Sequence, residues 1–305
     1  MSYDGDVGPH GMMCLTMENS DLSPELQIKA QALDWILRAL ESVAVAFSGG
    51  IDSTVVAAAA HRALGERAIA VTADSASVPR SELAEAKALA QRIGIAHRIV
   101  STREFEDADY IRNDGSRCFF CKDELYSRIE DLLPDLGVAV ICSGANLDDM
   151  GDYRPGLKAA ADHRVRHPLQ EAGFTKADVR GLGRHWRLPT WDKPASPCLS
   201  SRLVPGLEVT TERTRRIEEA EAYLRTLGLR ELRVRLHEGE LARIEVPAEA
   251  IAMLAADHVR AEIARVMKDL GFRFITLDLE GFRSGNLNQL ISLETKRAFS
   301  NTEPS

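Results

Sequence analysis

The chain has 305 residues, of which 45% are hydrophobic and 28% charged, a composition typical of a globular protein with room for two domains. The formal net charge of −8 argues against a broad nucleic-acid surface, so nucleic acid is not an expected partner. No apolar run approaches the ~18 residues of a membrane span, and no secretory signal pattern is present, so we expect a cytoplasmic protein without a membrane partner. Five cysteines are too few for a disulfide framework in so long a chain, and we expect reduced thiols.

A polar turn lies between the first predicted strand and the helix that follows it. Residues 43–47 are apolar and predict a buried strand, and residues 54–64 predict a helix rich in Ala and Val. The turn reads Ser48-Gly49-Gly50-Ile51-Asp52-Ser53. Adjacent glycines let the backbone approach a bulky anion, and the N–H groups of a starting helix point at it. The serine hydroxyls add donors, and Asp52 could hold Mg²⁺ between phosphate oxygens.

This turn lacks the lysine and the length of the G-x-x-x-x-G-K-[ST] loop. It resembles the S-G-G-x-D-S pyrophosphate loop, or PP-loop, of the N-type ATP pyrophosphatases, which cleave ATP to AMP and pyrophosphate. The alternative is a glycine-rich strand-to-helix turn without a ligand. The resemblance predicts that ATP is a substrate.

Strands and helices alternate in the first half of the chain. We expect helices over residues 24–42, 81–93 and 122–133, and strands over residues 68–72, 97–100 and 138–142. This alternation predicts an α/β fold with a doubly wound parallel sheet. Ligands bind at the carboxyl ends of such strands, where Asp74 and Gly144 also fall, so both are expected to face the nucleotide.

The pattern changes near residue 205. Helices are expected over residues 211–227 and 248–270, and short strands over 231–236, 241–246 and 272–277, with a hairpin between the first two strands. These elements predict a smaller α+β domain. The expected organisation is a flexible tail (1–22), a PP-loop domain (23–205), a C-terminal α+β domain (206–290) and a second flexible tail (291–305).

Three cysteines could meet in space. Cys118 and Cys121 form a C-x-x-C pair at the start of a predicted helix, and Cys198 lies in a later Pro- and Ser-rich loop. A C-x-x-C pair by itself fits a redox pair, half of a zinc site or no site at all. Structural zinc requires a fourth ligand, and Cys142 is better explained as a buried strand residue. Three cysteines with an open position are what a [4Fe–4S] cluster that binds an additional sulfur requires.

Four stretches together resemble the LarE family. They are SGGIDS at 48–53, DMGDYRPG at 149–156, KPASPCLSSR at 193–202 and LDLEGFRSG at 277–285. The resemblance extends from about residue 26 to residue 288.

The resemblance implies an ATP-dependent sulfurtransferase that adenylates pyridinium-3,5-biscarboxylic acid mononucleotide and converts its carboxylates to thiocarboxylates for the nickel-pincer cofactor of lactate racemase. Some members sacrifice the sulfur of one cysteine, and others hold a [4Fe–4S] cluster with three. Cys198 matches the sulfur-bearing position, and Cys118 and Cys121 place this chain with the cluster type. The family also implies a homo-oligomer, with oligomerisation or sulfur transfer assigned to the C-terminal domain, and leaves the sulfur donor unidentified.

The expected site follows from the loops and the resemblance. Cys198 and Asp52 are expected to be catalytic, and Mg²⁺ is expected at Asp52 with Asp149 or Asp152. ATP is expected to contact Ser48, Gly49, Gly50, Asp52, Ser53, Asp74, Gly144 and Lys193. The substrate phosphate is expected at Ser201, Arg202, Arg233 and Arg235, of which the last two share one strand face. Lys193 could instead be solvated, and the strand arginines could pair with Glu231 or Glu245.

Other enzymes carry the same loop. A tRNA thiolation enzyme combines it with a three-cysteine cluster but predicts a basic face, which the net charge opposes. Amide-forming ligases such as NAD or GMP synthetases share the loop and do not require the three cysteines. Sacrificial use of Cys198 without a cluster, and a nucleotide-binding regulator with structural zinc, are further alternatives.

Overall fold

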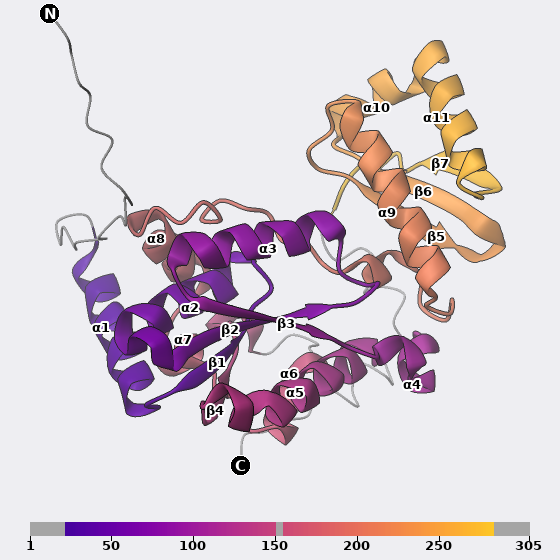
Figure 1. Cartoon of the computed structure of the whole chain (residues 1–305). Coiled ribbons are helices and arrows are strands. Elements are labelled where there is room, and N and C mark those ends of the chain that lie inside the picture. Colours follow the sequence, from indigo (N-terminus) through magenta and orange to yellow (C-terminus); the bar gives the residue numbers. More distant parts are fainter. Residues whose placement is uncertain (1–21, 151–154, 284–305) are drawn as a thin grey trace, which may run out of the picture.

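The computed structural model describes residues 22–150 and 155–283 of the chain. Its centre is a parallel sheet with the strand order β3-β2-β1-β4 (Figure 1), which confirms the predicted α/β fold. Both neighbours of β1 align with it from their first residues, because Val43 pairs with Ala68 and with Val140. The strands are β1 (Val43–Ala46), β2 (Ala68–Asp74), β3 (Ala96–Ser101) and β4 (Val140–Cys142).

Helices cover both faces of this sheet, and the apolar strand residues are buried between them. One face packs against α1 (Pro24–Ala39), α2 (Ile51–Leu64), α3 (Arg80–Ile93) and α8 (Lys176–His185). The other face packs against α5 (Arg117–Leu136) and α6 (Pro155–Asp162). Shorter helices are α4 (Ala108–Ile111) and α7 (Pro168–Glu171). Burial on both faces explains why β1 is apolar at every position rather than alternating.

The strand order creates a switch point between β1 and β4. From β1 the chain proceeds through β2 and β3 on one side of the sheet, and β4 then pairs with the other side of β1. Ligands of open α/β sheets bind outside the carboxyl ends of the strands at such a point. The loops 48–53 and 143–149 both begin there.

A second sheet lies in the C-terminal part of the chain. Strands β5 (Arg233–His237) and β6 (Leu241–Glu245) are antiparallel, as the predicted hairpin requires, and β7 (Phe274–Leu277) is parallel to β6. Helix α9 (Thr211–Thr226) packs on this sheet, and the expected single helix over 248–270 is two helices, α10 (Ala248–Ala255) and α11 (Asp257–Asp269), because Ala256 leaves the helical conformation.

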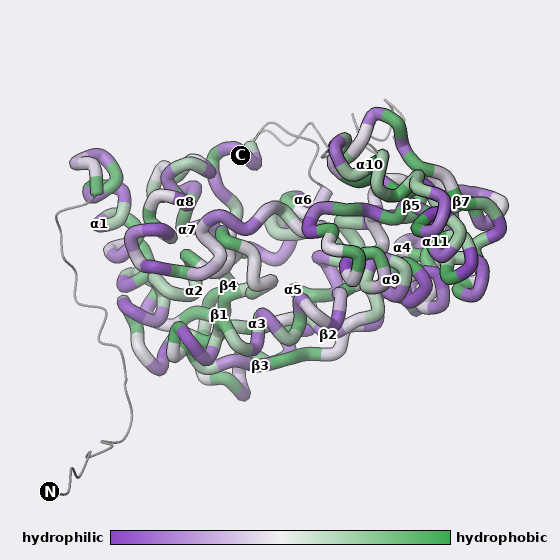
Figure 2. The backbone as a smooth tube through the Cα atoms, turned by 90° about the horizontal axis from the view of Figure 1, so that it is seen from above, coloured by the Kyte–Doolittle hydropathy of each residue, from purple (hydrophilic) through white to green (hydrophobic). Residues whose placement is uncertain are grey.

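Figures 1 and 2 both place these C-terminal elements at one end of the molecule, away from α1 and α8. They enclose a hydrophobic core of their own, to which Leu199 and Leu203 also contribute. The exact domain boundary near residue 205 stays a prediction. The expected tails lie outside the described residues, apart from Leu22. None of the helices described is long and apolar enough to cross a membrane.

Candidate active site

The loop after β1 is closed by its own side chains. Ser53 Oγ donates to the carbonyl of Gly50 at 3.1 Å and accepts from the amide of Ser48 at 3.2 Å. Gly49 has a φ of +74°, which favours glycine, and a Cβ there would lie 3.3 Å from the Cβ of Ala86 on α3. The loop ends at Gly50, the residue that caps α2. It therefore presents the first amides of a 14-residue helix at the switch point, an arrangement that attracts anions.

Gly144 brings the loop after β4 against this helix start. A Cβ added at Gly144 would lie 2.6 Å from the amide nitrogen of Ser53 and 2.8 Å from the carbonyl carbon of Asp52. Contacts this short are not tolerated between a side chain and backbone, so the position requires glycine for close approach. The structure thus joins two loops that the sequence pattern assigns to one nucleotide.

Asp52 is held by two partners in this arrangement. Its Oδ1 accepts from Asn146 Nδ2 at 3.0 Å, and its Oδ2 forms an ion pair with Lys176 Nζ. Asp149 is near by, where its Oδ2 accepts from the amide of Asn146 at 3.0 Å and completes a capping box. Asp152, the other expected magnesium ligand, lies outside the described residues.

Asp74 and Lys193 each have charged partners. Arg80 Nη1 donates to Asp74 Oδ1 at 2.6 Å, and Arg80 Nη2 donates to the carbonyls of Ser75 and Val78. Lys193 Nζ lies 2.6 Å from both Glu82 and Glu85 of α3. Burial opposes the charge of Lys193, but these two carboxylates outweigh it and raise the pKa of the ammonium. Lys193 is thus half-buried in ion pairs with α3 rather than freely solvated.

His97 supports the residue before the PP-loop through a hydrogen bond to Thr72. Thr72 Oγ1 donates at 2.6 Å to the carbonyl of Phe47, the last residue before the loop. The hydroxyl hydrogen is thereby used, so His97 Nε2, 2.8 Å from Thr72 Oγ1, is the donor of that second bond. Burial lowers the pKa of His97, with a smaller contribution from Lys87, so the neutral imidazole is favoured.

We expect His97 to make the fold sensitive to acid. Because the folded state binds the proton more weakly than the unfolded state, stability should fall as the pH drops below about 6.5, the ordinary pKa of histidine. His97→Gln keeps an N–H donor and should flatten this slope, measured as urea midpoints between about pH 5 and 8. His258→Gln, an exposed position on α11, is the control, and an unchanged slope in His97→Gln would contradict the assignment.

The segments that carry the cysteines are joined by polar contacts. Arg117 Nη1 donates to the carbonyl of Ser200 at 2.8 Å, and the buried phenol of Tyr110 lies 2.7 Å from Ser200 Oγ. Asn113 Nδ2 donates to the carbonyls of Val204 and Leu207, both at 2.9 Å. The residues just before Cys118 are therefore fixed to the residues just after Cys198.

The three cysteines interact electrostatically. Cys118 and Cys121 lie in the first turns of α5, the former exposed and the latter half-buried, and Cys198 precedes the 3-10 turn Leu199–Arg202. Burial raises the pKa of Cys121, and Cys198 and Glu104 raise it further. Cys142 is buried in β4, as expected, where burial raises its pKa to about 12. Across residues 22–150 and 155–283, no three His, Cys, Asp or Glu side chains are arranged to hold a single metal ion.

One hydrogen bond links the cysteine segment to the nucleotide end of the sheet. The amide of Leu199 donates to the carbonyl of Ser77 at 2.8 Å. Ser77 Oγ lies 2.8 Å from Ser75 Oγ, directly after β2, and 3.4 Å from Glu104 Oε1. Glu104 is 2% exposed, and its Oε2 has no hydrogen-bond partner among the described residues.

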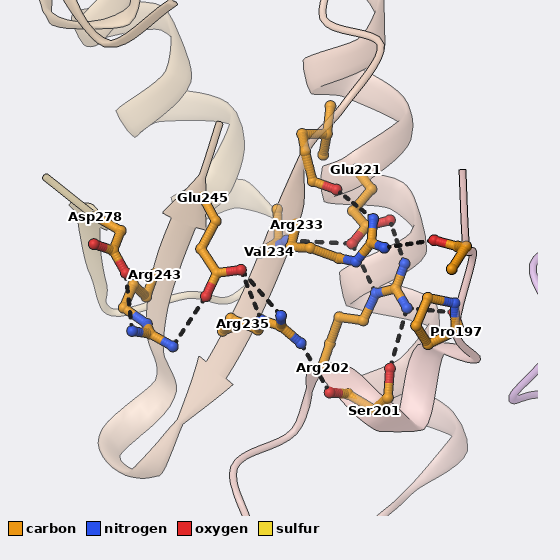
Figure 3. A network of polar contacts seen from close by, with 12 residues as sticks. Pro197, Ser201, Arg202, Glu221, Arg233, Val234, Arg235, Arg243, Glu245 and Asp278 are labelled. Carbon is orange, nitrogen blue, oxygen red and sulfur yellow. Dashed lines mark hydrogen bonds and ion pairs between the residues drawn. The ribbon is translucent and has the colours of Figure 1, made fainter. Parts of the chain in front are cut away.

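Arginine–glutamate pairs surround the Cys198 segment (Figure 3). Arg202, only 1% exposed, donates to Glu221 of α9 at 3.0 Å and to the carbonyls of Pro197 and Cys198. Ser201 Oγ donates to the carbonyl of Cys198 at 2.6 Å. The guanidinium of Arg202 therefore fixes the backbone of Cys198.

The two strand arginines differ in their partners. Arg235 is buried and pairs with Glu245 at 3.0 Å, which is the alternative role predicted for it, and it also donates to the carbonyl of Ser201. Arg233 pairs with none of the carboxylates described; its Nη2 donates to the carbonyl of Ala195, and its guanidinium lies 4.9 Å from the ring centre of Phe282. Burial, together with the positive charge of Arg202, lowers the pKa of Arg233 to about 10.

Sequence reasoning missed several residues of this site. The missed residues are Asn146, Lys176, Glu104, Arg117 and Glu221. Only Glu221 carried a usable signal: it lies on the face of α9 that Ile217, Ala220 and Leu224 bury, where a carboxylate needs a partner.

Comparisons with known proteins agree with this geometry. The asparagine synthase family matches residues 30–113, which contain the PP-loop. The pyridinium-3,5-bisthiocarboxylic acid mononucleotide synthase of Lactiplantibacillus plantarum is 39% identical over 269 residues, 88% of this chain and 96% of the relative. An uncharacterized protein of Synechocystis sp. is 44% identical over 267 residues, 88% of this chain and 99% of the relative. A glutamine-hydrolyzing GMP synthase chain of Saccharolobus islandicus is 28% identical over 188 residues, 56% of this chain and 49% of the relative.

The parallel sheet and the loop at its switch point define an ATP-using enzyme of the PP-loop class. The identity to the Lactiplantibacillus plantarum synthase covers nearly all of both chains. The chain therefore belongs to the LarE family of ATP-dependent sulfurtransferases, which confirms the resemblance found in the sequence.

Proposed function

We propose that this enzyme converts the carboxylates of pyridinium-3,5-biscarboxylic acid mononucleotide to thiocarboxylates, for the nickel-pincer cofactor. The observation that carries the proposal is the hydrogen bond between Leu199 and Ser77, because it ties the Cys198 segment to the nucleotide end of the sheet. The identity to the Lactiplantibacillus plantarum synthase supports the choice of substrate. A cytoplasmic homo-oligomer, supplied with sulfur by a separate donor, completes the proposal.

The carboxylate must first be activated, since it is a poor electrophile. A carboxylate oxygen attacks the α-phosphorus of ATP, and the bond from that phosphorus to the bridging oxygen breaks, so pyrophosphate leaves with the electron pair. The amides of Gly49 and Gly50, the hydroxyl of Ser48 and the start of α2 would stabilise the charge of this leaving group. Nucleophilic sulfur then attacks the acyl carbon, and AMP leaves with the electron pair of the broken C–O bond.

Asp52 has the right chemistry for Mg²⁺, which prefers carboxylate oxygens and phosphates. Its side chain is 25% exposed, and the pairing with Lys176 shows that this position accepts a cation. Asp149, which accepts from the amide of Asn146 at this end of the sheet, has a carboxylate of the same chemistry. Asp74 fits the nucleotide end through its place as the last residue of β2, and Lys193 stays a prediction.

The substrate phosphate fits best beside Arg233. This guanidinium has backbone carbonyls and an aromatic ring as neighbours, and it forms no salt bridge with a described carboxylate. Arg235 and Arg202 already pair with buried glutamates. They would therefore contribute positive potential at this place rather than unoccupied hydrogen-bond donors. Ser201 would add a hydroxyl at the same place.

Cys118, Cys121 and Cys198 fit a [4Fe–4S] cluster in donor set and charge. Thiolates are the ligands such clusters use, and Cys198 is close enough to raise the pKa of Cys121. Arg117 and Lys122 adjoin the thiols and form no salt bridge with the described carboxylates, so they can balance the negative charge of bound thiolates. When bound, a cluster with three cysteine ligands supplies an iron that can carry the transferred sulfur.

The test compares Cys118→Ala and Cys198→Ala with the parent enzyme, all purified without oxygen. We expect about four irons and four sulfides per chain in the parent, loss of both in each variant, and loss of thiocarboxylate product by at least a hundredfold. Binding of ATP should be retained in both variants, because neither cysteine belongs to the PP-loop.

The outcomes separate the alternatives. A parent enzyme that is active without iron and whose Cys198 loses one sulfur atom per turnover would establish the sacrificial route and exclude the cluster. Thiolation of tRNA in place of the mononucleotide would overturn the proposed substrate.

A further inference from the structure

A basic surface lies along α8 and the turn that follows it. Its cations are the four arginines Arg62, Arg180, Arg184 and Arg187. Arg180 and Arg184 are four residues apart on α8, so their side chains lie on the same face of the helix. Arg187 is exposed two residues beyond the end of α8, and Arg62 reaches across from α2, with its guanidinium 5.0 Å from the ring centre of Trp186. Four positive charges therefore gather around one helix.

Carboxylates do not neutralise this basic surface within the described part of the chain. In residues 22–150 and 155–283, none of the four guanidinium groups forms a salt bridge. Arg180 donates to the carbonyls of Trp191 and Lys193, at 3.0 and 3.2 Å, which uses its donors but leaves its charge. Arg184 lies over the ring of Trp191, 5.3 Å from its centre, and Trp191 is 38% exposed. Such a surface suits an acidic ligand that also carries apolar side chains.

The chain enters the described structure beside this surface. Helix α1 begins at Pro24, and both views place α1 next to α8 (Figures 1 and 2). A Cβ added at Gly181 would lie 3.0 Å from Leu26 Cδ2, so the first turn of α1 touches α8 one residue away from Arg180. Along the helix axis, this contact is only about 4.5 Å from Arg184.

The segment that precedes α1 has the opposite charge. Residues 1–21 contain no lysine or arginine, and their carboxylates are Asp4, Asp6, Glu18 and Asp21. Six residues separate Glu18 from Pro24, and an extended chain of that length spans up to about 20 Å. The two acidic residues nearest to α1 are therefore within reach of the arginines of α8.

We propose that residues 4–21 of this chain dock on the basic surface, with Glu18 and Asp21 beside Arg184, and keep other polyanions away from α8. Leu15 and Met17 supply apolar side chains for the exposed ring of Trp191. Ion pairs at an exposed surface are individually weak and are screened by salt, so high ionic strength displaces the segment. The inference concerns a surface outside the ATP and cysteine sites and does not depend on the proposed reaction.

The test is zero-length cross-linking of the full chain carrying Arg184→Lys. A carbodiimide joins a carboxylate to an amine in direct contact, so the lysine introduced at position 184 should couple to Glu18 or Asp21, as identified by mass spectrometry. The yield should fall at least about threefold between roughly 0.05 and 0.5 M NaCl, because the Debye length shortens.

Arg164→Lys is the matched control. Arg164 is also exposed and forms no ion pair with the described carboxylates, but it follows α6 on the other face of the sheet and should give no such product. Mixing isotope-labelled with unlabelled chains shows whether a product joins one chain or two. Products within one chain support the inference, whereas products only between chains, or none at low salt, overturn it.

A second measurement uses heparin as a polyanion probe. Replacing the four carboxylates of residues 1–21 by amides in the full chain should open the basic surface and raise heparin affinity about tenfold at roughly 0.1 M salt. Adding Arg62→Gln and Arg184→Gln to this variant should return the affinity to that of the parent.

A control of equal net charge separates the surface from the total charge. It replaces by amides four exposed carboxylates that form no ion pair in the described structure, namely Asp135, Asp162, Glu231 and Glu249. Its heparin affinity should stay within about threefold of the parent, because these positions are not on the basic surface. If the parent already binds heparin as tightly as the variant neutralised in residues 1–21, the surface is open and the inference is overturned.

Discussion

Gly144→Ala is expected to lose most of its affinity for ATP. The added Cβ would lie 2.6 Å from the amide nitrogen of Ser53 and 2.8 Å from the carbonyl carbon of Asp52, and neither backbone atom can move away without shifting the start of α2. Forcing a methyl group into such a contact costs about 1–3 kcal/mol, or roughly five- to 150-fold in affinity if the strain falls on the phosphate site. Calorimetric titration with Mg²⁺–ATP measures the loss.

Gly181→Ala provides the matched control. Gly181 lies inside α8, and a Cβ there would meet one methyl of Leu26 at 3.0 Å, the end of a flexible side chain. Because alanine also favours the helix by about 0.5–1 kcal/mol, this variant should bind ATP as the parent does. Equal affinity in Gly144→Ala would mean that the loop after β4 retreats without cost and does not shape the phosphate site.

The sheet and its loops could be predicted from the sequence because their signals are local. Residues 43–47 are apolar without interruption, which marks a strand buried on both faces, and the SGGIDS turn follows at once. Thr175 has the side chain of a helix cap, and it caps α8. The observed boundaries of the elements differ from the predicted ones by a few residues. The helix predicted over 248–270 is two helices in the structure, and the break at Ala256 could not be predicted because no proline or glycine marks it.

The partners of the charged side chains could not be predicted, because they depend on contacts distant in sequence. Lys176 pairs with Asp52 across 124 residues, and Lys193 pairs with Glu82 across 111 residues. The sequence analysis selected Lys193, which lies in a stretch that resembles the family, and missed Lys176. Only the structure, in which α8 begins at the switch point, shows that Lys176 pairs with Asp52 of the PP-loop whereas Lys193 pairs with Glu82 of α3.

The same reasoning applies to Arg202, which the sequence pattern places among the phosphate ligands. Its donors are occupied by Glu221 and by the carbonyls of Pro197 and Cys198, so its first effect is on the cysteine backbone. Fixing this backbone before the substrate arrives favours the reaction, because a misplaced nucleophile or sulfur carrier lowers the rate steeply.

Glu221→Gln is expected to destabilise the protein strongly. The glutamate is 1% exposed, pairs with the equally buried Arg202 and accepts from the amide of Val234 at 3.2 Å. Removing one partner of a buried pair leaves an uncompensated charge and costs about 3–5 kcal/mol. Urea unfolding should show this loss, whereas Glu219→Gln, on the exposed face of the same helix, should change stability by less than about 0.5 kcal/mol.

The double variant Arg202→Met/Glu221→Gln distinguishes stability from positioning. It removes the buried charge and keeps an oxygen for the amide of Val234, so much of the stability should return. The carbonyl of Pro197 still lacks its guanidinium donor and that of Cys198 keeps only Ser201, so thiocarboxylate formation should stay low while Mg²⁺–ATP binds normally. If product formation returns together with stability, the pair serves the fold alone. If it does not, the guanidinium of Arg202 positions the cysteine on which sulfur transfer depends.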